Sequence, residues 1–199
     1  MKIQFSYILL VLLTLTSCKE DLAKRTSENA KDAKKKEVIF DNINKGWNFN
    51  AQPANTTSQS LANTWSEWRV FLGELSQKPK STMGAFQKKA KTLSVKVMEL
   101  NNNIPAPYNN PAVKSRIGVL TTKINSLNLY INLDEIPDQK VIALIADINI
   151  ELASLQGQFD EIVRKNLIPK EEGESDLIKM MDTSRAIPTS RAPDQINIK

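Results

Sequence analysis

The sequence of 199 residues contains no histidine and only one cysteine. The absence of histidine excludes Ser-His-Asp and Cys-His catalysis, imidazole-bound metals, haem with a proximal histidine and a histidine pH switch. A single cysteine excludes an internal disulfide and a thiolate cluster. The sequence therefore gives no reason to expect a metal or a cofactor, and we expect that the protein is not an enzyme.

Neither sign of charge dominates the chain. It has 27 Lys and Arg against 22 Asp and Glu, a formal net charge of +5. This excess is too small, and too mixed with acids, to indicate nucleic-acid binding. The acidic residues do not follow the spacing of a calcium-binding EF-hand loop. No set of catalytic or metal-ligating residues can be named from the sequence.

The chain begins with an apolar run that is too short to cross a membrane. Met1-Lys2 supplies a positive start, and residues 3–15 are uncharged and mostly apolar. As a helix, this run spans about 20 Å, which is less than the roughly 30 Å hydrocarbon core of a bilayer. A positive start and a short apolar run are typical of a secretory signal peptide. We expect residues 1–17 to be such a peptide.

The cysteine lies immediately after this run. Leu15-Thr16-Ser17-Cys18 resembles the lipobox of bacterial lipoproteins, in which a leucine and two small residues precede the cysteine that is lipidated. The resemblance implies cleavage before Cys18 and attachment of acyl chains, such as palmitate, to its sulfur and its new amino group. At about 0.8 kcal/mol for each buried methylene, several chains would form an essentially permanent membrane anchor. The alternative is a lone buried thiol.

The residues after Cys18 bear on which membrane holds the protein. The aspartate that retains some lipoproteins at the inner membrane is missing from the position after Cys18. Lys19-Glu20-Asp21 is similar to the lysine-plus-two-acidic signal that sends some Gram-negative lipoproteins to the cell surface. These resemblances imply a lipid-anchored protein of the outer membrane that is exposed at the cell surface. An ordinary charged tether is the alternative for these three residues.

Two segments without a regular apolar period follow the cysteine. Residues 18–36 are rich in charge and read as a lipidated tether, with transient helix at residues 30–36. As a coil, the tether would hold the rest of the chain on the order of 25 Å from the membrane. Residues 37–58 contain Gly46 and Pro53, which argue against one continuous helix. We therefore expect an irregular apolar arm at residues 37–58.

The arm is expected to pack against the outside of the main domain. Off-period residues such as Val95 and Met98 offer apolar surface for it. Binding of a partner protein is the alternative role of the arm, and its candidate partner-binding residues are Phe40, Trp47 and Phe49.

Residues 59–168 are dominated by apolar residues at alternating steps of three and four. This period indicates helices with one buried stripe, because strands need a period of two. Asn110-Pro111 is a typical helix start, and Ser81 or Thr82 and Asp138 are candidate N-caps. Short connections favour antiparallel neighbours, so the sequence predicts an all-α fold, an antiparallel up-down-up-down four-helix bundle. The four stripes run from Leu61 to Leu75, from Met83 to Leu100, from Val113 to Ile131 and from Val141 to Ile162.

The remaining features leave the biochemical role open. Residues 169–199 read as a tail with a short helix around residues 176–181 and then disorder. Trp65 and Trp68 lie on one stripe and are interpreted as core packing, with an aromatic ligand platform as the alternative. The leading hypothesis is a membrane-anchored, non-catalytic lipoprotein that acts as an interaction or structural module at the cell envelope, with a protein partner. The alternative is a helical bundle that binds a small apolar or anionic ligand.

Overall fold

All regular elements that the structure describes are helices. The computed structural model describes residues 22–169 and 179–181, and no strand occurs among them. The all-α fold class is therefore confirmed. The chain divides after Asp160 into two compact units. The elements are α2 (Leu22–Gly46), α3 (Thr56–Thr64), α4 (Ser66–Ser76), α5 (Met83–Glu99), the short 3-10 helix η1 (Ala106–Tyr108), α6 (Pro111–Ile131) and α7 (Asp138–Leu167).

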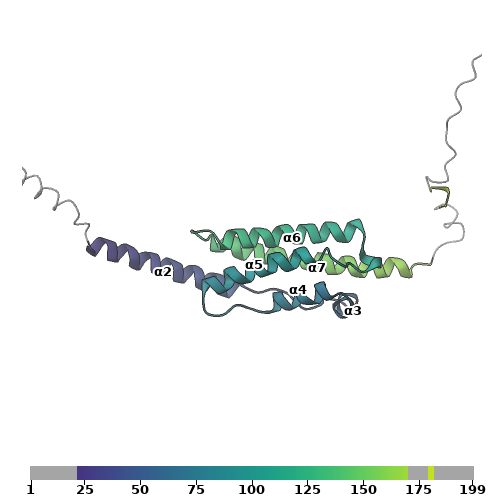
Figure 1. The fold of residues 1–199 in the computed structure, drawn as a ribbon, viewed down its shortest axis with the longest axis horizontal. Helices are drawn as coiled ribbons and strands as arrows, with labels where there is room; N and C mark the ends of the chain where they lie inside the picture. The colour runs from purple at the N-terminus through teal and green to yellow at the C-terminus, as the bar shows by residue number, and fades with distance from the viewer. Residues whose placement is uncertain (1–21, 170–178, 182–199) are drawn as a thin grey trace, which may run out of the picture. The chain divides into compact units, whose positions relative to one another are not determined.

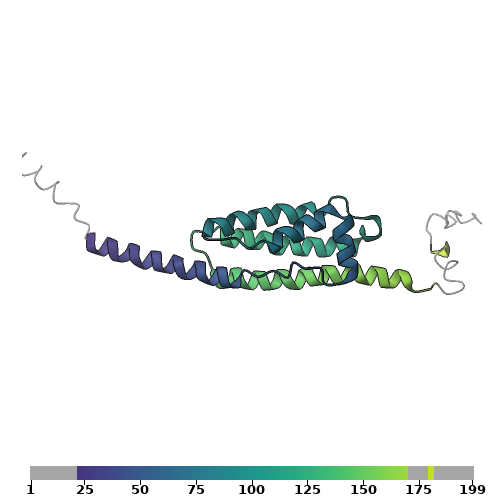
Figure 2. The same cartoon turned by 90° about the horizontal axis from the view of Figure 1, so that it is seen from below.

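The apolar stripes form the core of the first unit. Helices α5, α6 and α7 lie lengthwise beside one another, and α4 packs against α5 (Figures 1 and 2). The predicted stripe positions on α6 are all fully buried, and Met83 at the start of the α5 stripe is half-buried. The core positions with no exposed surface on α5, α6 and α7 include Phe86, Leu93, Val97, Ile117, Leu120, Ile124, Ile148, Leu152 and Phe159.

Side-chain caps start three of the helices. The Asn110 Oδ1 atom accepts a hydrogen bond from the Val113 N–H at 3.1 Å, and Pro111 follows as the first helical residue. Thr82, not Ser81, caps α5, with Oγ1 accepting from the Ala85 N–H at 3.2 Å. These bonds satisfy amide donors that a helix leaves unpaired in its first turn. Asn55 caps α3 in the same way, through a 2.7 Å bond from the Ser58 N–H.

The first predicted helix of the bundle is broken in two. Trp65 has extended backbone angles, φ −108° and ψ 102°, and separates α3 from α4. Its side chain is nevertheless buried, and the indole N–H donates to the Asn102 carbonyl at 3.3 Å. The Trp65 and Trp68 rings stack with centroids 6.2 Å apart. The apolar spacing alone could not reveal the break, because Trp65 stays on the buried side.

The tether and the arm are more ordered than predicted. Helix α2 runs from Leu22 to Gly46 and so covers most of the expected tether and the first half of the expected irregular arm. Its side chains from Lys24 to Val38 are exposed, and burial begins only with the last turns. Alanine, lysine and glutamate are good helix formers, and no glycine or proline occurs before Gly46. The prediction of an irregular arm was therefore wrong for residues 37–46.

Residues 47–55, the connecting segment, run along α7 without regular structure (Figure 2). The Asn149 Oδ1 atom accepts from the Asn50 N–H at 2.8 Å, and its Nδ2 donates to the Asn48 carbonyl at 3.0 Å. Further along, the Gln156 Oε1 atom accepts from the Ala54 N–H at 2.6 Å. Side chains of α7 thus take the place of a paired strand in satisfying this backbone.

The second unit is described only in part. Within it, Glu161 pairs with Arg164 and lies 3.5 Å from Lys165, one helical turn later. The short helix predicted around residues 176–181 falls mostly outside the described residues, and so does the predicted disorder from residue 182 onward.

Candidate functional site

The predicted lipidation site lies outside the described residues. Cys18, the lipobox residues Leu15, Thr16 and Ser17, and the residues Lys19, Glu20 and Asp21 all precede the first described position. Their role therefore stays a prediction from the sequence. Within the part of the chain that the structure describes, no helix is both long and apolar enough to cross a membrane.

The aromatic residues of the arm pack into the fold. Trp47 is only 3% exposed, and its ring centroid lies 5.0 Å from that of Phe86 on α5. Phe40 meets Phe86 edge-on at 5.9 Å, and Phe49 meets Trp47 edge-on at 5.4 Å. This packing gives the three candidate partner-binding residues a place in the fold, and their binding of a partner stays a prediction. It also corrects the expected place of docking, because Val95 and Met98 remain about half exposed.

The tryptophan pair forms part of the core. Trp65 and Trp68 are 1% and 0% exposed, and the ring of Phe159 lies 6.1 and 5.5 Å from them. The Trp68 indole N–H donates to the Ser58 carbonyl at 3.4 Å. Neither ring offers an open face to a ligand, so the geometry favours core packing over an aromatic platform.

Acidic groups are dispersed over the described surface. No cluster of three or more Asp, Glu, Cys or His side chains placed to hold a metal occurs in residues 22–169 and 179–181. The pKa of Glu67 is lowered, mainly by a 2.8 Å hydrogen bond from the Asn103 amide and then by one from Ser66. The pKa of Lys123 is raised by its 2.8 Å hydrogen bond to Asp147. These are isolated polar contacts at the surface.

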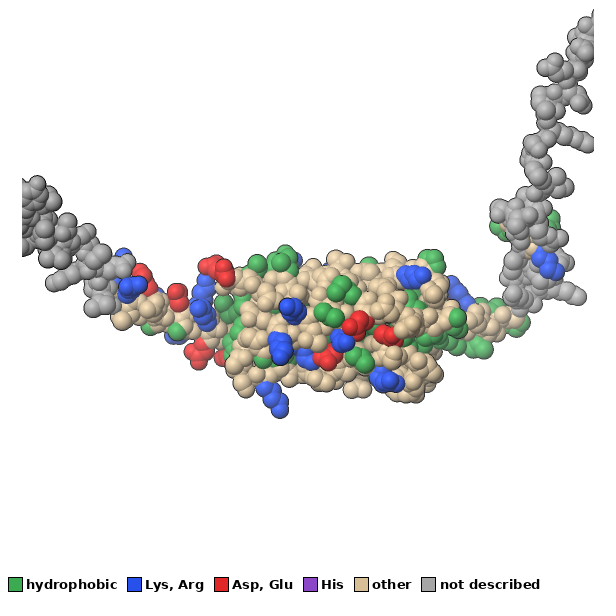
Figure 3. Space-filling model, viewed as in Figure 1, with side chains coloured by type: hydrophobic (Ala, Val, Ile, Leu, Met, Phe, Trp, Pro, Cys, Tyr) green, Lys and Arg blue, Asp and Glu red, His purple; other side chains and the backbone are tan. Residues whose placement is uncertain are grey.

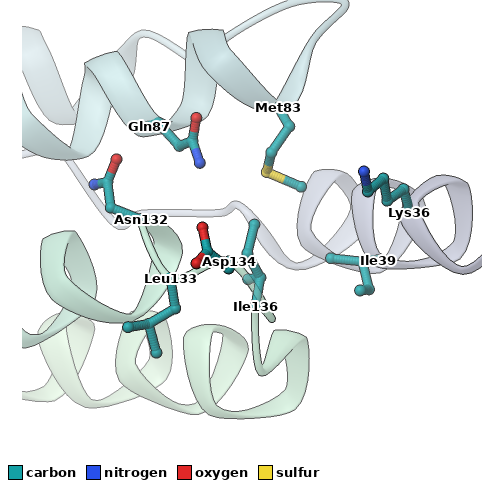
Figure 4. A pocket seen from close by; sticks show the side chains of 8 residues that line it. All are labelled: Lys36, Ile39, Met83, Gln87, Asn132, Leu133, Asp134 and Ile136. Atoms are coloured by element: carbon teal, nitrogen blue, oxygen red, sulfur yellow. The ribbon is translucent and has the colours of Figure 1, made fainter. Parts of the chain in front are cut away.

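A hollow of about 300 Å³ lies where α2, the start of α5 and the connection from α6 to α7 meet (Figure 4). Its wall combines aliphatic side chains with two amides, a carboxylate and an ammonium group. The Met83 side chain points from α5 toward Ile39 on α2, and the Asp134 carboxylate points toward Gln87. The lining residues are Lys36, Ile39, Met83, Gln87, Asn132, Leu133, Asp134 and Ile136.

Hydrogen bonds at the end of α6 and the start of α7 hold the residues that line this hollow. Helix α6 ends at Ile131, whose carbonyl accepts a 3.0 Å hydrogen bond from the Gln87 amide. The Asn132 Nδ2 atom donates to the Asn128 carbonyl at 2.7 Å and so closes the last turn of α6. The chain then turns back, and α7 begins at Asp138. Asp138 is thus the first helical residue rather than the N-cap, and its carboxylate accepts from the Asn42 amide at 2.6 Å.

A second hollow of about 510 Å³ adjoins the first, and Ile39 and Ile136 line both hollows. Lysines of α2 form much of its rim. Lys35 lies 3.7 Å from Glu135, while Lys31 and Lys34 have no ion-pair partner among the described residues. At this end of the first unit, green, blue and red side chains meet (Figure 3). Its lining residues are Lys31, Lys34, Lys35, Val38, Ile39, Ile136 and Asp138.

The sequence did not indicate this pair of hollows. It assigned the lysines to a flexible tether and Ile39 to an irregular arm, so the two groups were not expected on one helix. The available signal was the eight-residue run from Lys31 to Val38, whose first and last members share a helix face with Lys34 and Lys35.

The paired hollows can hold a small molecule against aliphatic surface and offer it lysine ammonium groups and the carboxylates of Asp134 and Asp138. They therefore provide the features of a binding site, an apolar lining with a few charged groups. The chain matches no family model, no curated protein and no solved structure in comparisons with each.

Proposed function

We propose that the protein is a membrane-anchored, non-catalytic lipoprotein that acts as an interaction or structural module at the cell envelope. The observation that carries this proposal is the position of the only cysteine. Cys18 follows a short apolar run with a positive start, and Leu15-Thr16-Ser17 precedes it as a lipobox requires. The acyl chains would hold the protein at a bilayer without a transmembrane span.

The outer membrane is the proposed location, with the protein facing the cell surface. Lys19 stands where an inner-membrane lipoprotein would have aspartate, and the two acidic residues Glu20 and Asp21 follow it. Surface exposure suits a module that meets other proteins of the envelope, and such a protein is its proposed partner.

Helix α2 supports this role as a stalk. Residues 24–38 are exposed, and 15 residues of helix extend about 22 Å at 1.5 Å per residue. A helix that starts only a few residues after Cys18 would keep the body of the first unit away from the lipid headgroups. A coil of the same length would leave that distance undefined.

The proposed body is an antiparallel up-down-up-down four-helix bundle. Its members would be α3 and α4 together, α5, α6 and α7. The buried stripes on these helices and the short connections between them support this topology. The absence of histidine from the sequence and the dispersed acidic groups support a non-catalytic role.

The decisive experiment replaces Cys18 by serine. When the wild-type protein is expressed in cells that are given labelled palmitate, it should incorporate the label. It should also enter the detergent phase when a detergent extract of the cells is separated into two phases. Cys18→Ser should take up no label, keep its apolar N-terminal run unprocessed and leave the outer-membrane fraction. Equal labelling and equal membrane fractionation of the two proteins would contradict the proposal.

A second candidate function is the binding of a small apolar or anionic ligand. The hollow of about 300 Å³ beside Met83 and Gln87 is the observation that favours it, because its volume lies at the lower end of ligand pockets. Ligand-induced shifts of the Met83 methyl signal in NMR spectra would test this function. If a broad set of apolar and anionic compounds leaves this signal unmoved, the hollow is not a ligand site.

A further inference from the structure

The two hollows beside α2 form one site with two chemically different ends. They share Ile39 on α2 and Ile136 on the connection to α7, so the two hollows adjoin at these two residues. The larger hollow is lined by three lysines, Lys31, Lys34 and Lys35, whereas the smaller one has a single lysine, Lys36, together with Met83 and the carboxylate of Asp134. A ligand that fits both ends would need an apolar part and a charged part.

The apolar part of the site comes from separate elements of the first unit. Ile39, Ile136 and Met83 are half-buried, so each keeps apolar surface that is open to a ligand. Val38 and Leu133 add surface that is 51% and 41% exposed. Exposed aliphatic side chains are normal when single, but a group that lines a concave surface is typical of binding sites.

The charged end has an excess of unpaired positive groups. Lys31, Lys34 and Lys35 lie on one face of α2, one helical turn apart, and Lys35 approaches Glu135 at 3.7 Å. Lys31 and Lys34 have no anionic partner among the described residues. An ammonium group beside apolar surface is well placed to pair with an anionic ligand.

The acidic residues of the site do not cancel this preference. The Asp138 carboxylate already accepts a 2.6 Å hydrogen bond from the Asn42 amide. Asp134 lines the smaller hollow, where its carboxylate points toward Gln87 (Figure 4), and it does not line the larger hollow with its three lysines. Negative charge is therefore expected at the lysine end of the ligand and not at the end that meets Asp134.

We propose that the paired hollows bind an anionic amphiphile, whose alkyl chain lies on Ile39, Ile136 and Met83 and whose acidic head group meets Lys31 and Lys34. The proposal rests on the second candidate function above and assigns its ligand class. It does not depend on lipidation of Cys18. The shared chemistry is a carboxylate or phosphate on a single alkyl chain.

The test follows methyl signals of the full-length Cys18→Ser protein by NMR, so that no attached acyl chain competes for the site. The probes are sodium dodecanoate, dodecyl phosphate, dodecyltrimethylammonium and dodecyl maltoside, each below its micelle-forming concentration. Both anions should shift the Ile39, Ile136 and Met83 signals in a saturable way. The cation and the neutral sugar should leave these signals unmoved at the same concentrations. A shift with only one of the two anions would show whether the site prefers a carboxylate or a phosphate head group.

A charge-reversed variant tests the placement of the head group. Lys31→Glu with Lys34→Glu should weaken dodecanoate binding by about tenfold or more, since each lysine near an anion contributes appreciably. Lys91→Glu with Lys114→Glu is the matched control, because both side chains are exposed and the change in net charge is identical. The control should bind as the unmodified chain does.

These two experiments distinguish a wrong ligand class from a wrong binding site. Equal shifts with the cation, or an unchanged affinity of the Lys31 and Lys34 variant, would overturn the anionic class and leave the second candidate function standing. No shift of these three methyl signals with any probe would overturn both. Neither result would affect the anchoring proposal, which the palmitate experiment decides.

Discussion

Gly46 and Ile142 are in closer contact than any other residue in place of Gly46 would allow. A Cβ atom at Gly46 would lie 2.7 Å from Cγ1 and 3.1 Å from Cγ2 of Ile142, which belongs to α7. These are the first side-chain carbons beyond the Ile142 Cβ and can move little without a shift of the helix. The last residue of α2 therefore fixes how near this helix lies to α7.

Gly46→Ala should destabilise the protein although alanine is the better helix former. Overpacking costs about 1–3 kcal/mol, which outweighs the roughly 1 kcal/mol gained in helix propensity. We expect a lower midpoint in thermal or urea denaturation. Combining Gly46→Ala with Ile142→Ala should cost less than the sum of the single changes, which a double-mutant cycle measures.

Gly157→Ala is the control for this prediction. An added Cβ at Gly157 meets no atom within 4 Å, and the residue is exposed on α7. This variant should be as stable as the unmodified chain or more stable. A Gly46→Ala protein that gains stability as Gly157→Ala does would show that α2 is not held against α7.

Gln156→Leu should loosen the connecting segment. Gln156 is 2% exposed, and its Oε1 atom accepts hydrogen bonds from the Ala54 N–H and, at 2.8 Å, from the Ser58 hydroxyl. Leucine would leave both donors unpaired, at a cost of about 1–3 kcal/mol. The Ala54 amide should then exchange with deuterium much faster. Gln139→Leu, at an exposed position of the same helix, should leave that exchange rate unchanged.

Leu120→Asp and Ile148→Asp test whether the stripes face one core. Both side chains have no exposed surface, so each aspartate would be buried without a partner and should cost several kcal/mol. Val119→Asp is the matched control, since Val119 neighbours Leu120 and is 41% exposed. Denaturation curves should separate the two buried variants from the control. Three similar curves would refute the core position of the stripes.

Asn103→Gly should raise the pKa of Glu67. The Asn103 amide makes the largest contribution to lowering this pKa, and glycine removes it while accepting the left-handed backbone, φ 52°, at this position. Ser66→Ala should raise the pKa less. Titration of the Glu67 carboxyl signal by NMR measures both changes, and a larger effect of Ser66→Ala would contradict the assignment.

The hydrogen bond from Asn103 to Glu67 also predicts how the stability of the fold changes with pH. A lowered carboxyl pKa stabilises the fold above the ordinary value of 4.5 and loses this effect as the pH falls through the folded-state pKa. The stability difference between the unmodified chain and Asn103→Gly should therefore be larger at neutral pH than in acid.

The sequence predicted the helices that have one regular apolar stripe. On α6, every predicted stripe position from Val113 to Ile131 is buried, because a three-and-four spacing directly reports a helix face. It did not predict the break at Trp65, since a single extended residue leaves that spacing intact. Helix α2 was missed for a different reason. Its first half is exposed on all sides, so it has no stripe, and its charge was read as a sign of coil.

The candidate site was missed because it joins residues that lie far apart along the chain. Ile39 and Met83 carry no motif, and their proximity follows from the last turns of α2 packing near the start of α5. The lipobox can be read from the sequence because its residues are consecutive. A hollow between helices depends on tertiary packing, which local spacing does not encode.

The connecting segment forms hydrogen bonds with residues far along the chain, and this separation determines when the fold can be completed during synthesis. The Asn50 and Ala54 amides bond to residues 99 and 102 positions later. A growing chain exposes α2 and the connecting segment long before α7 exists, and contacts of such separation slow folding. Helix α7 therefore completes the hydrogen bonding of the connecting segment, and a chain that is cut before residue 149 should leave the backbone of Asn48, Asn50 and Ala54 without these partners.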